Sequence, residues 1–281
     1  MEIQQTKLYS QYILSLGWKA LEVDDVYLYC KYFPIIGGLA KIQRSDKLPN
    51  IDKLITILKK ERIKTIAVEP SQTFDQNKLV KYVESLKSAG FRINSSPFLP
   101  TKTLRINLEP SEDEIFKNFN EAKRRAVRRA IKNEVTIQES DNINNLIKIK
   151  NKSGGFFGFI TTYGIDKLWP IFAPQNSTIV LAYDNRNMII GGVLLLYHNN
   201  IAYYWIAGSS KYGKKLFAPT LLVWEAIKLA KKRGMKQFDF IGVWDERIPK
   251  DNSTWKGFTK FKEGFGGDTL YYPITIFKKS S

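Results

Sequence analysis

Apolar residues in the first third of the chain recur at helical spacing and then at strand spacing. Leu8, Tyr12 and Leu16 lie four residues apart before Gly17, which predicts a helix over residues 6–16. The same reasoning, with alternating apolar positions for strands, predicts the elements that follow. They are strands at 18–23, 26–33, 39–43, 64–68, 91–94 and 103–108, and helices at 51–60 and 75–89.

The remainder of the chain has a similar pattern. Ser111 is followed three residues later by Glu114, the spacing of a capping box at a helix start. Asparagine-rich tips at 184–187 and 198–200 fit tight hairpins between strands. The predicted helices are 111–133, 142–151, 163–172, 218–233 and 255–263, and the predicted strands are 178–183, 188–197, 201–207, 236–241 and 270–277.

Both halves therefore have the order helix, three meander strands, helix, strand, helix, strand. This order is typical of the GNAT N-acyltransferase fold, although an order of elements is a weaker signal than a sequence repeat and establishes no chemistry. We expect an α/β (α+β) protein of tandem GNAT-like domains, each a mixed, mostly antiparallel sheet flanked by helices. Residues 1–106 with 270–281 should form the first domain, and residues 107–269 the second.

The segment 255–267 carries the most distinctive pattern of the chain. Phe258, Phe261 and Phe265 lie three and four residues apart, so they share one face of a helix beside Lys262. A cation held against aromatic rings, next to a glycine-rich exit, suits the stabilisation of a developing negative charge. The alternative interpretation is an amphipathic helix docked on a sheet, with solvated lysines.

Composition narrows the choice of chemistry. The chain has 281 residues and a net charge of +17, which favours polyanionic partners such as RNA, phosphorylated precursors or an anionic membrane face, unless it reflects only a lysine-rich composition. Cys30 is the only cysteine and His198 the only histidine. A disulfide framework, a Cys/His zinc site and a Ser-His-Asp triad are all disfavoured, so we expect no metal and no cofactor.

The first five residues lack a basic region followed by an apolar run, so they do not resemble a signal peptide. The most apolar segment, 188–197, is far shorter than the roughly 20 residues that span a bilayer. We expect a cytoplasmic protein that at most contacts the inner face of the membrane peripherally.

Six segments of the chain stand out as motifs: LPTKTLRINL at 99–108, SEDEI at 111–115, RRAVRRAIKNEV at 124–135, YYWIAGS at 203–209, FDFIG at 238–242 and GFTKFKEGFG at 257–266. Together they resemble the FemXAB (FemABX) family, the aminoacyl-tRNA-dependent transferases that form peptidoglycan bridges. The resemblance covers residues 97–277 clearly and the first half faintly, through Gln5-Thr6, Gly17-Trp18 and Glu69-Pro70.

The chain also departs from the family pattern. Asn107 replaces a usual aspartate and Glu134 a usual glycine. No coiled-coil arm is inserted, and no match to the family's phosphate-binding N-terminal lysine can be placed. The acceptor therefore stays open between UDP-MurNAc-pentapeptide and lipid II.

The resemblance implies an enzyme that moves an amino acid from aminoacyl-tRNA, its co-substrate, to an amine of the stem peptide of a peptidoglycan precursor. It points to Lys262 as the group that stabilises the oxyanion. It also implies substrate contacts from the matched segments, at Tyr204, Ser209, Phe261 and Phe265. We expect the enzyme to be a monomer.

Other site assignments rest on spacing and residue type. Arg124 and Arg128 lie four apart on one helix face and suit phosphate groups, although any basic helix face would attract anions. The general base is open among Glu69, Asp239 and Asp245, and Asp239 is expected to contact substrate or to orient a loop. The terminal hydroxyl of the tRNA could serve instead.

Two other functions remain as alternatives. The first is a GNAT-type N-acyltransferase that uses acyl-CoA and acts on a different amine. Its pyrophosphate loop would be 209–217, which has one glycine and two lysines where further small residues belong. The second is an RNA-binding protein without enzymatic activity, which rests on charge alone.

Overall fold

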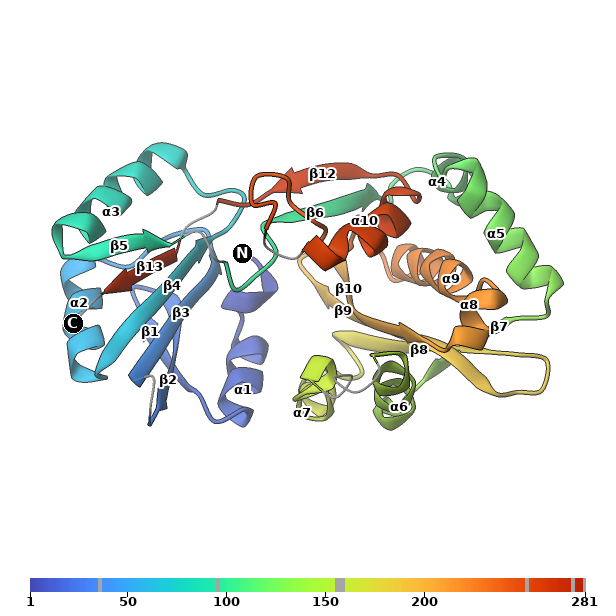
Figure 1. Cartoon of the computed structure of the whole chain (residues 1–281), viewed down its shortest axis with the longest axis horizontal. Coiled ribbons are helices and arrows are strands. Elements are labelled where there is room, and N and C mark those ends of the chain that lie inside the picture. The colour runs from blue at the N-terminus through green and yellow to red at the C-terminus, as the bar shows by residue number, and fades with distance from the viewer. Residues whose placement is uncertain (35–36, 95–96, 155–159, 251–252, 274–275, 280–281) are drawn as a thin grey trace. The chain divides into compact units, whose positions relative to one another are not determined.

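The computed structural model describes residues 1–281 apart from 35–36, 95–96, 155–159, 251–252, 274–275 and 280–281 (Figure 1). The chain forms two compact units. The first consists of Met1–Lys102, Trp244–Ser253 and Leu270–Ser281, and the second of Thr103–Val243 and Thr254–Thr269. Each unit has its own sheet and its own buried core.

The first unit is built on a six-stranded sheet of order β1-β2-β3-β4-β13-β5. Its strands are β1 (Lys19–Val23), β2 (Val26–Phe33), β3 (Gly37–Ser45), β4 (Ile63–Pro70), β5 (Phe91–Asn94) and β13 (Ile276–Lys279). Its helices are η1 (Ile3–Gln5), α1 (Lys7–Ser15), α2 (Ile51–Lys60) and α3 (Gln76–Ser88). β3 and β4 are parallel, and the other pairs are antiparallel.

Local signals explain why the helices of the first unit begin where they do. The Asn50 side chain accepts hydrogen bonds from the Asp52 and Lys53 amides and so caps α2. Leu54 and Leu58, one turn apart on α2, are buried against the sheet core. The predicted helix and the observed one therefore coincide.

The second unit is built on a seven-stranded sheet of order β12-β6-β11-β10-β9-β8-β7. Its strands are β6 (Lys102–Asn107), β7 (Thr136–Ser140), β8 (Ser177–Tyr183), β9 (Ile189–His198), β10 (Ile201–Ser209), β11 (Gln237–Asp239) and β12 (Asp268–Tyr271). Its helices are α4 (Glu112–Lys117), α5 (Glu121–Lys132), α6 (Ile143–Gly154), α7 (Ile165–Phe172), α8 (Lys211–Lys215), α9 (Ala218–Lys232), η3 (Ser253–Trp255) and α10 (Lys256–Glu263).

The two faces of this sheet are covered by different helices. A Cβ atom added at Gly191 would meet Leu222 of α9, whereas one added at Gly192 would meet Leu146 of α6. Because consecutive strand residues point to opposite faces, α9 covers one face and α6 the other, as Figure 1 shows. β8 and β9, buried along almost their whole length, are therefore apolar on both faces.

The parallel pair β10–β11 is unusually short. Only Ile201, Ala202 and Tyr203 pair with β11, although β10 continues to Ser209. In the same stretch β10 is irregular against β9, with a register shift between Tyr204 and Ile206. The chain therefore leaves the ladder immediately after Asp239, and this departure positions the candidate site described below.

Some predicted elements were wrong in extent. The single helix predicted at 111–133 is two helices, because Asn120 caps α5 with its side chain on the Lys123 amide. The strand predicted at 103–108 as the last of the first half is β6 of the second sheet. The strand predicted at 270–277 is divided between β12 and β13, and residues 274–275 of it, with 280–281 of the expected first domain, lie outside the described residues. β7 and α8 were not predicted.

Within the described ranges, no helix combines the length and the apolar character needed to cross a membrane.

Candidate functional site

Lys262 lies near the end of α10, and its ammonium is held by backbone. The Nζ atom donates to the carbonyl oxygens of Phe240, at 2.8 Å, and of Gly242, at 2.6 Å. It also lies 4.8 Å from the centre of the Phe258 ring. Burial lowers the pKa of Lys262 to about 8, so the group is mostly charged at neutral pH yet titrates far below an exposed lysine.

The two carbonyls belong to a tight turn that follows β11. The Gly242 amide donates to the Phe240 carbonyl at 2.8 Å, which closes a three-residue turn around Ile241. Ile241 has a φ of 67°, so this is the rare γ-turn with a left-handed central residue. A β-branched residue is strained at such a φ. The turn places two carbonyl oxygens on either side of Ile241, and both accept from Lys262.

Asp239 anchors that turn from within the core. It is 1 % exposed, and its Oδ1 accepts from the Ile241 amide at 2.5 Å and the Thr103 hydroxyl at 2.7 Å. Its Oδ2 accepts from Nε of Arg105 at 2.6 Å. Both oxygens are therefore engaged by donors from β6 and from the turn itself.

An ammonium has three protons, and two of the Lys262 protons are engaged by the turn. The part of the chain that the structure describes provides no third acceptor for Nζ. A fixed, charged donor with one unused proton can bond to an oxygen atom that carries developing negative charge. This is the chemistry expected of Lys262 from the sequence, and its catalytic role stays a prediction.

The aromatic residues around Lys262 divide into an exposed and a buried group. Phe258 is about one-third exposed and packs on Trp255, with ring centres 5.1 Å apart. Phe265 follows the end of α10 and is 1 % exposed, packed against Phe119 and Phe240. Phe261 lies between them and contacts Phe265, with ring centres 5.2 Å apart. The face predicted for these rings therefore continues from the site into the core.

Two further lysines with a lowered pKa lie in the second unit, and sequence reasoning missed both. Lys123 of α5 lies 3.6 Å from the centre of the Phe261 ring, and burial lowers its pKa to about 8. Burial, followed by the charge of Lys214, lowers the pKa of Lys150 on α6. Lys150 in turn contributes to the lowered pKa of Lys262. These lysines lie on separate helices, so no sequence pattern marks them out among the other basic residues.

The glycines after α10 allow a close backbone approach, as the sequence suggested. Gly267 has a φ of 92°, and a Cβ atom there would lie 2.5 Å from the Arg105 carbonyl oxygen. A Cβ atom at Gly264 would lie 2.6 Å from the Lys123 side chain. This approach ties the end of α10 to β6, the strand that also carries the partners of Asp239.

Arg124 and Arg128 lie on α5, as expected. The Arg124 Nη1 atom donates to the carbonyls of Lys117, at 2.7 Å, and Phe119, at 2.5 Å, so it closes the end of α4. Arg128 is exposed, 6.0 Å from the Phe116 ring centre. Their binding of substrate phosphate stays a prediction.

Tyr204 and Ser209 both lie on β10, beyond Tyr203, the last residue of β10 that pairs with β11. The Tyr204 ring packs against Phe240, with centres 5.7 Å apart, and burial raises its pKa. The Ser209 hydroxyl donates to the Ile190 carbonyl at 2.9 Å. Both side chains are thus joined to the core around the turn, and substrate contacts for them also stay predictions.

The loop after β10 is where the alternative function would place a pyrophosphate. Some of its amides are engaged within the protein: Ser210 N donates to the Ile190 carbonyl and Lys214 N to the Ser210 carbonyl. Gly213 N donates to the Ser210 hydroxyl at 2.9 Å. Gly213 is needed for packing, since a Cβ atom there would lie 2.3 Å from the Ile190 oxygen.

The other two candidate bases lie in the first unit. Glu69 is buried, and its Oε1 accepts from the amides of Phe98, at 2.8 Å, and Leu99, at 2.7 Å. Burial alone would raise the pKa of Asp245, but hydrogen bonds from Arg247 and Thr101 outweigh it and hold that pKa below its ordinary value. Both carboxylates anchor backbone or side chains of their own unit.

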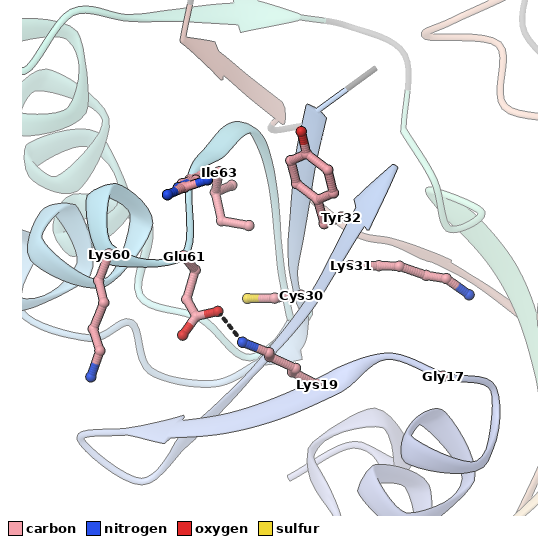
Figure 2. A pocket seen from close by; sticks show the side chains of 9 residues that line it. Gly17, Lys19, Cys30, Lys31, Tyr32, Lys60, Glu61 and Ile63 are labelled. Carbon is pink, nitrogen blue, oxygen red and sulfur yellow. Dashed lines mark hydrogen bonds and ion pairs between the residues drawn. The ribbon is translucent and has the colours of Figure 1, made fainter. Parts of the chain in front are cut away.

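Two hollows of the described chain are lined by residues other than Lys262. One of about 400 Å³ in the first unit is lined by Cys30, Glu61 and several basic residues. In Figure 2, Lys19 reaches Glu61, with which it forms an ion pair at 2.6 Å, while Lys31 and Lys60 point away from one another. The basic groups do not converge on a ligand. Within the same described ranges, no three His, Cys, Asp or Glu side chains are grouped as metal ligands would be.

The two sheets and their helices define the class of protein: an α/β protein with two GNAT-like units in tandem, which confirms the predicted fold. FemX has this fold at 15% identity, with a TM-score of 0.76 over 100% of this chain and 92% of that chain. The C-terminal domain of a putative lysylphosphatidylglycerol synthetase from Agrobacterium fabrum gives 11% identity and a TM-score of 0.60 over 96% of this chain and 87% of that one. A tandem GNAT protein from the clavulanic acid biosynthesis pathway gives 9% identity and a TM-score of 0.55, over 91% of this chain and 79% of that chain.

The FemAB family model matches residues 175–273, the part of the chain that carries Asp239 and Lys262. This match bears out the resemblance to the FemAB family seen in the sequence, and FemX shares the fold of the chain. No curated protein matches the chain. The family and the GNAT-like fold support an acyltransferase.

Proposed function

We propose that the protein transfers an aminoacyl group from aminoacyl-tRNA to the stem-peptide amine of a peptidoglycan precursor. The observation that supports this most directly is the Lys262 ammonium, which is held by two turn carbonyls and has no third acceptor among the described residues. The family match covers this residue, and the name FemX belongs to the similar structure, not to this chain.

In this reaction the amine attacks the ester carbonyl that links the amino acid to the tRNA ribose. The tetrahedral oxyanion that forms accepts the third Lys262 proton as a hydrogen bond. It then collapses with cleavage of the ester C–O bond, and an amide forms. The proton lost by the amine ends on the ribose oxygen that leaves.

The amine must lose its proton before it attacks, which costs about 4–5 kcal/mol at pH 7 for a group with a pKa near 10.4. Asp239, Glu69 and Asp245 each already accept several hydrogen bonds. The ammonium proton is lost to solvent before the attack. We assign to the terminal hydroxyl of the tRNA, one of the alternatives raised by the sequence, the relay of the second proton from the attacking nitrogen to the ribose oxygen that leaves.

The alternative acyl-CoA reaction has less support, because the loop after β10 has one glycine and two lysines where further small residues belong, and its Gly213 amide is engaged by the Ser210 hydroxyl. An assay that offers each donor separately decides between the two. The protein is mixed with either a charged tRNA pool or acetyl-CoA, and with UDP-MurNAc-pentapeptide or lipid II.

Product masses are then measured, with Lys262→Ala as the inactive control. We expect one amino-acid residue to be added only with charged tRNA. A product only with acetyl-CoA, or none with either precursor, would overturn the proposal. Phosphatidylglycerol vesicles are a further acceptor to include, because two proteins with a similar fold are described as lysylphosphatidylglycerol synthetases.

A further inference from the structure

Lys262 depends on a turn that is strained, and the strain needs an explanation. Ile241 has a φ of 67°, which glycine adopts freely and isoleucine does not. Without a restraint, Ile241 would relax to negative φ and rotate the peptide groups on both of its sides. Those peptide groups carry the Phe240 carbonyl and the Gly242 amide, so the turn would open.

The restraint on the turn is the Asp239 carboxylate. Its Oδ1 accepts from the amide of Ile241 itself, the strained residue, at 2.5 Å. Thr103 and Arg105 hold the carboxylate in turn, at 2.7 and 2.6 Å, and both project from β6. A buried charge held by a guanidinium and a hydroxyl cannot rotate to follow the turn.

We propose that Asp239 is a positioning residue, which holds the γ-turn at Ile241 and through it orients the two carbonyls that fix the Lys262 ammonium. This inference rests on the proposed function for its catalytic consequence. Asp239 then neither takes the proton of the amine nor touches substrate. Its effect reaches the reaction only through the direction of the third Lys262 proton.

The test is rescue at a second site. Asp239→Asn should lower kcat by about 10²-fold, the scale of misplacing a catalytic group, with KM for both substrates within about twofold of wild type. Ile241→Gly alone should keep wild-type kcat within about threefold, because glycine adopts positive φ without restraint. The double variant should recover at least about tenfold of the lost kcat, since glycine no longer needs the carboxylate.

Asp239→Glu is the second variant, in case Asp239→Asn does not fold. It keeps the charge for Arg105 but moves the oxygen by one methylene, so kcat should fall and Ile241→Gly should again restore it. If Ile241→Gly restores nothing in either background, Asp239 acts by some other route and the inference fails.

Amide hydrogen exchange at Gly242 gives a readout that does not need the reaction. This amide closes the turn but does not touch Asp239, so its exchange reports the turn itself. Exchange should be at least about tenfold faster in Asp239→Asn and return to the wild-type rate in the double variant. Unchanged exchange would overturn the inference even if the enzyme were active. If the protein transfers no aminoacyl group but its variants show this exchange pattern, the proposed function is wrong and the inference that Asp239 holds the turn stands.

Discussion

Replacing Lys262 by methionine should change the free energy of unfolding of the second unit, relative to the wild type, by an amount that falls as the pH rises. The perturbation keeps the length of the side chain and removes its charge. Lys262 has a pKa of about 8 in the folded chain, lowered by burial from 10.5. The folded state therefore binds the proton less tightly than the unfolded state, and the charge opposes folding.

The sign and size follow from linkage. Between pH 8 and 10.5 the unfolded chain binds the proton and the folded chain has lost it, so the stability of the wild type rises with pH. A full proton of difference changes the free energy of unfolding by about 1.4 kcal/mol per pH unit. Since the folded lysine is about nine-tenths charged at pH 7 and one-tenth charged at pH 9, the free energy of unfolding of Lys262→Met relative to the wild type should fall by about 1.3 kcal/mol between these pH values.

Urea unfolding of the wild type and of Lys262→Met at pH 7 and pH 9 measures the difference between their free energies of unfolding. The titration of the other groups cancels in this difference. Lys260→Met is the matched control, because Lys260 lies on the same helix and is exposed to water in both states. Its free energy of unfolding relative to the wild type should not change with pH. If the difference in free energy of unfolding between Lys262→Met and the wild type is the same at both pH values, the reasoning from a buried Lys262 charge is refuted.

Three further outcomes are expected. Lys262→Ala should lower kcat by about 10²–10³-fold with little change in substrate binding, because the oxyanion exists only in the transition state; an increase in KM alone would make Lys262 a ground-state ligand. Gly267→Ala should destabilise the protein by about 2 kcal/mol or more in thermal unfolding, through its φ of 92° and the Arg105 carbonyl 2.5 Å from the new Cβ. Gly257→Ala, in open space on α10, is its control and should be neutral or stabilising. The binding constant for tRNA, measured by titration at increasing salt, should fall with a slope of about 0.7–0.9 per released counterion when log K is plotted against log salt concentration. A binding constant that does not change with salt would show that the net charge of +17 does not serve RNA binding.

The sequence predicted best those elements whose signals are local. Asn50 and the apolar stripe behind it predicted the bounds of α2 correctly. Asn120 interrupted the helix predicted at 111–133 because its side chain prefers a cap, while the apolar periodicity gave no sign of a break. The alternation of Phe238 and Phe240 suggested a strand to 241, but the Asp239 carboxylate engages the Ile241 amide and ends the ladder.

The candidate site shows the same division. The place of Lys262 beside aromatic rings followed from spacing along one helix. Its acceptors did not, because Phe240 and Gly242 lie about twenty residues earlier and offer backbone oxygens, which every residue has. The lowered pKa of Lys123 arises from packing between helices and has no counterpart in the order of residues.

The position of β13 has a consequence for the order of folding during synthesis. This strand lies between β4 and β5, as Figure 1 shows, and pairs with both. Residues 276–279 leave the ribosome some 180 residues after Asn94, the last residue of β5. Until then, β4 and β5 each present an unpaired edge, which is a template for pairing with other chains. The half that is synthesised first is thus the half completed last, and the edges of β4 and β5 stay open until the end of the chain is made.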